Sequence, residues 1–363
     1  MKKKSFQKVG KEGWISVPDE FKATTGIIGM KEDGISIYAS NRYDKAYYCR
    51  ENIEQVSNYE KVKGCTMLLR GSGAKFCFYE LPDQEQKVLL VISVFAKTQE
   101  EAEDAFSILE KDMQGNLYTF GVTILPLNVE DKLYLMHRLI MQDAAQARID
   151  VNQYLAKTSG WLPDFRLSHY AEHDNYLETK ERCSCLMYVR KVPTEHAARV
   201  YQNIKSKEYC RLLVTTYESV TDQQVKENLQ NNYLGIDAFM QTLVRKKVGV
   251  GKIVEDRDDR RYVYAGIYFV ISDSTEEEVR KCKEELQTTL NMLGAQVEEY
   301  QFYQKQTWQK LATLNPWGVR QTRLMQSGNI VAMNPFYRET MVPDNEELSS
   351  KAELLAVFDA MTE

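Results

Sequence analysis

The pattern that most constrains this chain is a series of local signals that occurs twice. Each copy has an apolar strand-like run, a Thr helix cap with Glu three residues later, an apolar stripe at helical spacing, and a second strand-like run after a glycine. The copies span residues 88–125 and 262–303, with Thr98 and Thr275 as the caps. Because each helix connects two strands, the pattern predicts repeated β-α-β units and an α+β fold.

A further strand-helix-strand pattern lies upstream of the second copy. It consists of the strand-like residues 183–189, a helical pattern over 194–205 and the strand-like residues 211–217. Two such units in tandem are typical of a ferredoxin-like α+β sandwich. The polar stretch 221–247 between them is predicted to be a helical insertion.

The chain is long enough for two domains, because 363 residues of which 43% are hydrophobic can form a substantial core. The predicted boundary is the segment 144–164, which contains the sequence Trp-Leu-Pro. We therefore expect an N-terminal α+β domain over residues 1–150, a ferredoxin-like domain over 160–336 and a C-terminal tail over 337–363.

Charge and hydropathy limit the classes of partner. A net charge of −5 and a pI near 5.7 give no overall positive field, so direct nucleic-acid binding is not expected. The longest nearly unbroken apolar run, 88–96, is about half as long as a membrane-spanning helix, and the polar N-terminus lacks the apolar core of a signal peptide. The seven cysteines are odd in number and lie mostly in apolar runs. These features predict a cytoplasmic protein without a transmembrane segment, whose cysteines are reduced and buried.

The sequence has no evident nucleotide-binding loop. A phosphate-binding loop ends in Gly-Lys-Ser or Gly-Lys-Thr, whereas the Gly-Lys pairs at 10–11 and 251–252 are followed by Glu and Ile. The glycine-rich segment 71–75 precedes a strand-like run, where a phosphate loop requires a helix. The chain is therefore predicted to have no catalytic residue and no cofactor.

The strongest candidates for metal ligands are two cysteines and two histidines, namely Cys183, Cys185, His169 and His173. Their side chains include the sulfur and nitrogen ligands that zinc prefers. However, Cys-x-Cys on a strand places both thiols on one face, toward a core, and paired Cys-x-x-Cys spacing is absent. Buried thiols are favoured, and no metal is predicted.

The end of the predicted second domain carries an ordered set of short motifs. They are Leu-Ala-Thr-Leu-Asn-Pro-Trp-Gly at 311–318, Arg-Gln-Thr-Arg at 320–323, and Ser-Gly-Asn-Ile-Val-Ala-Met-Asn-Pro-Phe at 327–336. This order resembles the end of the N-terminal region in the conjugal-transfer ATPases of type IV secretion systems, of the VirB-four, TraC and TraE type, especially those of Gram-positive mobile genetic elements. The resemblance covers most of residues 26–336. After Phe336 the chain departs from the family pattern, so no ATP-site residue carries over.

The resemblance implies a non-catalytic assembly module that binds other secretion-channel proteins at the inner face of the membrane. Such a module would be cytoplasmic, held at the membrane by its partners, and compatible with self-association. Two alternatives stay open. One is a truncated conjugal-transfer ATPase whose nucleotide-binding domain lies beyond this chain, which a downstream Gly-x-x-x-x-Gly-Lys-Thr reading frame would favour. The other is a ligand-binding regulatory protein with ferredoxin-like domains, which a pocket with convergent polar groups would favour.

The candidate docking residues combine the aromatic and guanidinium groups that anchor interfaces, and they are Trp317, Arg320, Arg323 and Phe336. The alternative is that Trp317 and Phe336 fasten the C-terminal segment to the second domain as ordinary core residues. The arginines distinguish these two interpretations. Docking would leave them exposed beside an apolar patch, whereas fastening would bury them against carboxylates.

Overall fold

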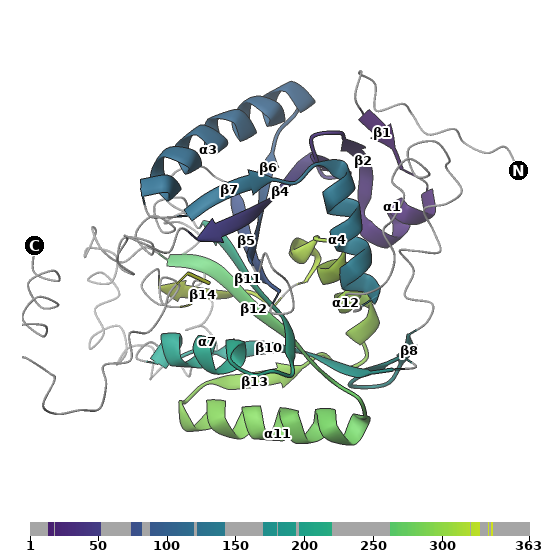
Figure 1. The fold of residues 1–363 in the computed structure, drawn as a ribbon, viewed down its shortest axis with the longest axis vertical. Coiled ribbons are helices and arrows are strands. Elements are labelled where there is room, and N and C mark those ends of the chain that lie inside the picture. Colours follow the sequence, from purple (N-terminus) through teal and green to yellow (C-terminus); the bar gives the residue numbers. More distant parts are fainter. Residues whose placement is uncertain are drawn as a thin grey trace, which may run out of the picture.

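The computed structural model describes residues 14–17, 19–51, 74–81, 88–119, 122–141, 170–179, 181–193, 196–219, 262–319, 321–326, 333 and 335–336 (Figure 1). The strands are β1 (Trp14–Ser16), β2 (Ile27–Lys31), β3 (Ser36–Tyr38), β4 (Arg42–Glu51), β5 (Lys75–Glu80), β6 (Val88–Phe95), β7 (Val122–Pro126), β8 (Ala171–Glu172), β9 (Leu177–Glu178), β10 (Cys183–Lys191), β11 (Cys210–Ser219), β12 (Tyr262–Asp273), β13 (Gln296–Glu299) and β14 (Arg323–Gln326). The helices are α1 (Asp19–Thr25), α3 (Gln99–Thr119), α4 (Val129–Met141), α7 (Ala197–Lys205), α11 (Glu276–Met292), α12 (Gln304–Ala312) and the 3-10 helix η2 (Pro316–Gly318). Within the described part of the chain, no helix is long and apolar enough to cross a lipid bilayer.

The strands of the described residues form one 14-stranded sheet with antiparallel pairings, and both halves have the same strand order. In the second half the order is β13-β10-β12-β11, with α7 connecting β10 to β11 and α11 connecting β12 to β13. In the first half the order is β7-β4-β6-β5, with α3 connecting β6 to β7. Both predicted strand-helix-strand segments are present, and the α+β class is confirmed.

The two halves join through β5 and β11, which are antiparallel neighbours in the middle of the sheet (Figure 1). Phe76 pairs with Tyr217, and Glu80 pairs with Leu213. The strand order is therefore the same when it is read inward from either end, as β3-β4-β6-β5 and as β9-β10-β12-β11. The sheet is continuous between the two predicted domains. The predicted boundary segment, the helical insertion and the C-terminal tail lie outside the described residues.

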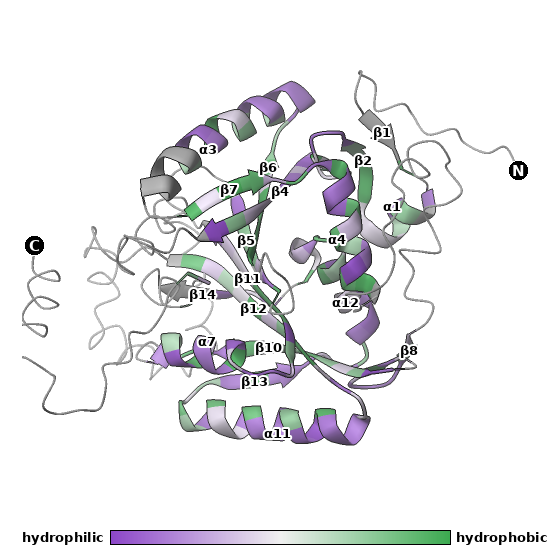
Figure 2. Cartoon of the chain, viewed as in Figure 1, coloured by the Kyte–Doolittle hydropathy of each residue, from purple (hydrophilic) through white to green (hydrophobic). Residues whose placement is uncertain are grey.

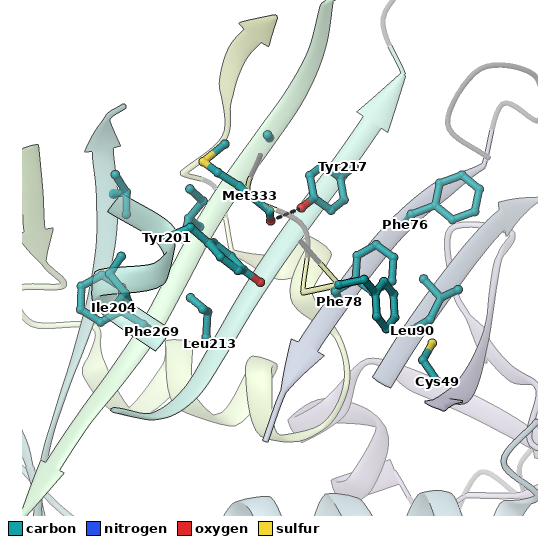
Figure 3. Close-up of a cluster of buried hydrophobic side chains, with 14 of the residues drawn as sticks. Cys49, Phe76, Phe78, Leu90, Tyr201, Ile204, Leu213, Tyr217, Phe269 and Met333 are labelled. Carbon is teal, nitrogen blue, oxygen red and sulfur yellow. Dashed lines mark hydrogen bonds between the residues drawn. The ribbon is translucent and has the colours of Figure 1, made fainter. Parts of the chain in front are cut away.

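Helices cover both faces of the sheet, because strand side chains alternate between two cores. Phe76 and Phe78 of β5 belong to the α11-side core, which also holds apolar residues of α3, α7 and α11. Cys77 and Tyr79 of the same strand belong to the α4-side core, together with residues of α1, α4 and α12. Figure 3 shows Phe76 and Phe78 among the buried side chains of the α11-side core. The period of two along β5 thus separates the two layers of helices.

The two repeated helices begin where the sequence predicts. Thr275 Oγ1 accepts the N–H of Glu278 at 3.3 Å, and the Glu278 carboxylate accepts the N–H of Thr275 at 3.1 Å, which completes a capping box. Thr98 Oγ1 accepts the N–H of Glu101 at 3.2 Å. Gly294 follows α11 with φ +78°, a conformation that glycine adopts without strain. In Figure 2 the hydrophobic residues of α11 lie mainly on the side toward the sheet.

Each half has a buried polar side chain near the start of a helix, namely α4 after β7 in the first half and α12 after β13 in the second. Lys132 of α4 donates to Ser36 Oγ at 2.7 Å and to the Asp44 carbonyl at 3.4 Å. Gln304 of α12 donates to the Leu186 carbonyl at 3.3 Å. Asp44 lies on β4 and Leu186 lies on β10, which hold corresponding places in the orders β7-β4-β6-β5 and β13-β10-β12-β11. Each of these helices is therefore hydrogen-bonded to the corresponding strand of its own half.

Candidate functional site

The Asn-Pro-Trp-Gly motif that ends the second half packs against the first half. Asn315 donates to the Thr25 carbonyl at 3.0 Å and accepts a hydrogen bond from Arg42 at 2.7 Å. Trp317 is half-buried against the α4-side core, and the Lys75 ammonium lies 5.6 Å from the centre of one of its rings. The motif contacts α1, β4 and β5, so it helps to hold the two halves together.

Phe336 is also an internal contact. It is 3% exposed in the α11-side core and meets Phe78 edge to face, with the ring centres 5.9 Å apart. The Tyr217 hydroxyl donates to the carbonyl of Met333, three residues earlier, at 3.1 Å (Figure 3). Because Phe78 belongs to β5 and Tyr217 to β11, this segment packs over the strand pair that joins the halves.

The structure does not bring the predicted docking residues into one surface. Trp317 borders the α4-side core, whereas Phe336 lies in the α11-side core on the opposite face of the sheet. Arg320 lies outside the described residues. Arg323 is exposed at the start of β14, close enough to act electrostatically on Tyr188 and Glu298, which line a groove. Arg323 is therefore exposed near a carboxylate of the groove.

This open groove has a volume of about 510 Å³ and follows β13. Its lining comes from β13 itself, from the loop after it and from three neighbouring segments, with the residues Val297, Glu298, Glu299, Tyr300, Gln301, Tyr303, Tyr188, Gln287 and Gln321. Val297 belongs to the α11-side core, whereas Glu298 pairs with Tyr188, which belongs to the α4-side core. A groove that is lined from both faces of a sheet passes around the edge of a strand. The groove therefore lies along the outer edge of β13.

The carboxylates of the groove are already paired. Tyr188 and Arg190 donate hydrogen bonds to Glu298, and these bonds lower the pKa of Glu298. Glu299 accepts a hydrogen bond from Lys283 at 2.8 Å. Burial, followed by the hydrogen bond to Glu298, raises the pKa of Tyr188 to about 12, so this hydroxyl is a protonated donor at neutral pH. The lining presents hydroxyls, amides and neutralised carboxylates.

Two exposed aromatic side chains stand beside the groove. Phe302 is 66% exposed and Tyr303 is 62% exposed. Phe302 has φ +62°, which is uncommon for a residue with a side chain, and its N–H donates to the Asp174 carbonyl at 2.7 Å. Strained backbone that is held in place by its surroundings is a feature of functional loops. Tyr303 lines the groove, and the exposed Phe302 directly precedes it in the chain, so exposed aromatic surface lies at the end of a polar groove.

The sequence pattern misses this site because it predicts a strand that extends to residue 303. In the structure β13 ends at Glu299, since the positive φ of Phe302 turns the chain and Tyr303 becomes the N-cap of α12. The available signal is the density of aromatics after Glu299, with Tyr300, Phe302 and Tyr303 within four residues. Alternating side chains in a strand could equally produce it.

A second group of polar side chains is enclosed beneath α4. Arg42 Nε lies 3.1 Å from Asp44 Oδ1, and Asp44 and Lys132 are each 1% exposed. Burial lowers the pKa of Lys132 to about 8 and raises the pKa of Asp44. Because neither group reaches solvent, a substrate has no access to them. This cluster serves to connect α4 to β3 and β4.

The cysteines and histidines weighed as metal ligands take different positions. Cys183 and Cys185 are buried in the α11-side core, and burial raises the pKa of Cys185 to about 12. The imidazole of His173 stacks on the Tyr176 ring, with the centres 4.2 Å apart, and His169 lies outside the described residues. Among the residues that the structure describes, no three His, Cys, Asp or Glu side chains are grouped as metal ligands.

Comparison with known proteins assigns no family to this chain. No family model and no curated protein matches it. A weak match among solved structures is that of a glycopeptide hexose oxidase complexed with teicoplanin, with a TM-score of 0.31 and 10% sequence identity. The match covers 70% of this chain and 42% of that chain. A TM-score at this level supports no conclusion about fold or function.

Proposed function

We propose that this chain is a non-catalytic docking module of a conjugative type IV secretion system. The docking role is supported by the open groove along β13, with Phe302 and Tyr303 exposed beside it. The secretion system is supported by the ordered motifs over residues 311–336, which resemble the end of the N-terminal region of conjugal-transfer ATPases. The proposed partners are other channel proteins at the cytoplasmic face of the membrane.

The proposed architecture is a pair of ferredoxin-like units that share one sheet. A ferredoxin-like unit has β-α-β-β-α-β connectivity. The second half has this connectivity from β10 to β13, with α7 and α11 packed in the same core. The first half has four strands in the corresponding order, and residues 52–73, between β4 and β5, lie outside the described range. The proposal therefore extends the ferredoxin-like prediction from the second half to the first.

The chemistry of the groove favours a protein partner over a small ligand. Small-molecule sites are mostly enclosed, largely apolar pockets with a few polar groups. This groove is open, and tyrosine hydroxyls, glutamine amides and paired carboxylates line most of it. Aromatic residues beside a polar rim are typical of protein interfaces, in which they supply most of the binding energy. The groove is accordingly the proposed docking surface.

The proposal is tested by removing the exposed aromatic pair without disturbing the fold. The double variant Phe302→Asn, Tyr303→Ser retains a residue that tolerates positive φ at position 302. We expect its affinity for the channel protein that co-purifies with the parent chain to fall about tenfold or more, which corresponds to about 1.4 kcal/mol. Isothermal titration calorimetry with the purified partner measures the change.

A matched control removes an exposed apolar side chain elsewhere. Ile108 of α3 is 62% exposed, so Ile108→Ser should leave both affinity and stability nearly unchanged. An equal loss of affinity in both variants, or full affinity in the double variant, would show that the groove is not the docking surface. If no channel protein of the same mobile element binds the parent chain, the assignment to a secretion system is wrong.

A further inference from the structure

We infer that the outer edge of β13 binds an extended segment of a partner protein as an added β-strand. The inference rests on the proposed docking function and specifies how the partner is held. Main-chain hydrogen bonds to β13 would supply one part of the contact, and an apolar side chain of the segment against Phe302 and Tyr303 would supply the other. Strand addition of this kind uses the main chain for affinity and side-chain positions for specificity.

The main chain of β13 has one side directed away from its neighbour. Within the described part of the chain, β13 pairs with β10 and with no other strand. The N–H of Tyr300 donates to the Leu186 carbonyl at 3.1 Å, which sets the phase of the hydrogen bonds toward β10. In antiparallel pairs the facing residues alternate, so Glu298 also faces β10. The main-chain groups of Val297 and Glu299 therefore point into the groove.

The corresponding strand of the first half has a different edge. β7 ends in Pro126, which has no N–H to donate, and proline is typical of strand edges that are protected from pairing. β13 has the sequence Gln-Val-Glu-Glu and contains no proline. The β13 edge thus lacks the proline that protects the β7 edge from pairing.

Pairing of strand edges is already how the chain assembles its own halves. In the order β13-β10-β12-β11, the strand β11 at one end is covered by β5 of the first half. The strand at the other end is β13, with the groove beside it. A partner strand could therefore pair with β13 at one edge of the second half in the way that β5 pairs with β11 at the other edge.

The charge balance of the groove defines the occupant. Glu298 is paired with Arg190, and Glu299 is paired with Lys283, so the groove has no unpaired carboxylate to select a basic peptide. The best complement is an uncharged extended segment with an apolar side chain at the end that reaches Phe302. Four residues of β13 extend over about 13 Å at roughly 3.3 Å per residue, which sets the length of the paired segment.

The probe for this inference is a set of overlapping peptides, each of about 12 residues, that cover the channel proteins encoded with this chain. Binding to the full chain is measured by fluorescence anisotropy. The tightest peptide is then made in two forms, in which the main-chain amides of alternate residues are N-methylated in opposite phase. We expect one form to bind about tenfold more weakly and the other to bind like the parent peptide, because alternate amides in an edge strand face the protein.

Each result decides the inference. A phase-dependent loss, together with weaker binding to the Phe302→Asn, Tyr303→Ser variant, supports strand addition at β13. Strand addition would be overturned, and the docking function left standing, by any of three results. The two N-methylated forms could bind equally, or the peptide could bind the double variant as well as it binds the parent chain. A full-length channel protein could also bind although no peptide does. Absence of binding by every full-length channel protein would overturn the docking function itself.

Discussion

Replacement of Phe336 separates the two roles that the sequence allows for this residue. Phe336 is 3% exposed in the α11-side core and packs edge to face on Phe78. Full burial of a phenylalanine contributes about 1.5 to 3 kcal/mol, and an aromatic pair adds about 0.5 to 1.5 kcal/mol. Phe336→Ala should therefore lower the free energy of unfolding by about 3 kcal/mol, in line with typical Phe→Ala substitutions in cores. That loss is a large share of the stability of an ordinary domain.

Urea unfolding followed by circular dichroism measures this change, provided that the slope of the transition is the same in both proteins. Phe336→Leu retains most of the apolar volume and should cost roughly half as much. Arg323→Glu, at an exposed position, is the matched control and should change stability by less than about 0.5 kcal/mol. If Phe336→Ala changes stability by less than about 1 kcal/mol but abolishes binding to a channel protein, the internal role assigned here to Phe336 is wrong.

Three further outcomes are expected. Burial lowers the pKa of Lys132 to about 8, so between about pH 8 and 10.5 the unfolded chain binds more protons than the folded chain. The contribution of Lys132 to the free energy of unfolding should therefore increase with pH across that window, by up to about 3 kcal/mol. Urea titrations at pH 8 and pH 10 should show that Lys132→Gln lacks this increase. Asn315→Ala should cost about 1 to 3 kcal/mol, because it removes the hydrogen bonds from Arg42 and to the Thr25 carbonyl. No loss of stability in urea unfolding would contradict the role of the motif in holding the halves together. Mg-ATP should not raise the melting temperature of the purified chain, and a rise that a substitution of one phosphate-contacting residue removes would reveal a nucleotide site.

The repeated strand-helix-strand segments could be predicted because their signals are local. Thr275 and Glu278 form the capping box within one helical turn, and Gly294 ends the same helix because glycine adopts a positive φ without strain. The buried cysteines follow from their place in apolar strands, as with Cys183 and Cys185 on β10. Such features depend on residues a few positions apart, which is the range over which a periodic pattern carries information.

The way in which the halves combine could not be predicted from the sequence. Phe76 pairs with Tyr217 across more than a hundred residues, and no local pattern specifies which strand edges meet. The groove escaped prediction for a related reason, because it depends on β13 having an uncovered edge and on the positive φ of Phe302. The candidate residues Trp317 and Phe336 have the composition of an interface, but composition does not distinguish a contact between proteins from one within a chain.

Site-specific photocrosslinking during conjugation tests the docking function most directly. A benzophenone amino acid is placed at Tyr303, beside the groove, and in a second strain at Ile108, where the side chain is exposed to a similar degree. Docking through the groove predicts a covalent product between position 303 and a channel protein of the secretion system, with no such product from position 108. Absence of a channel-protein product at 303, or the same products from both positions, would contradict it.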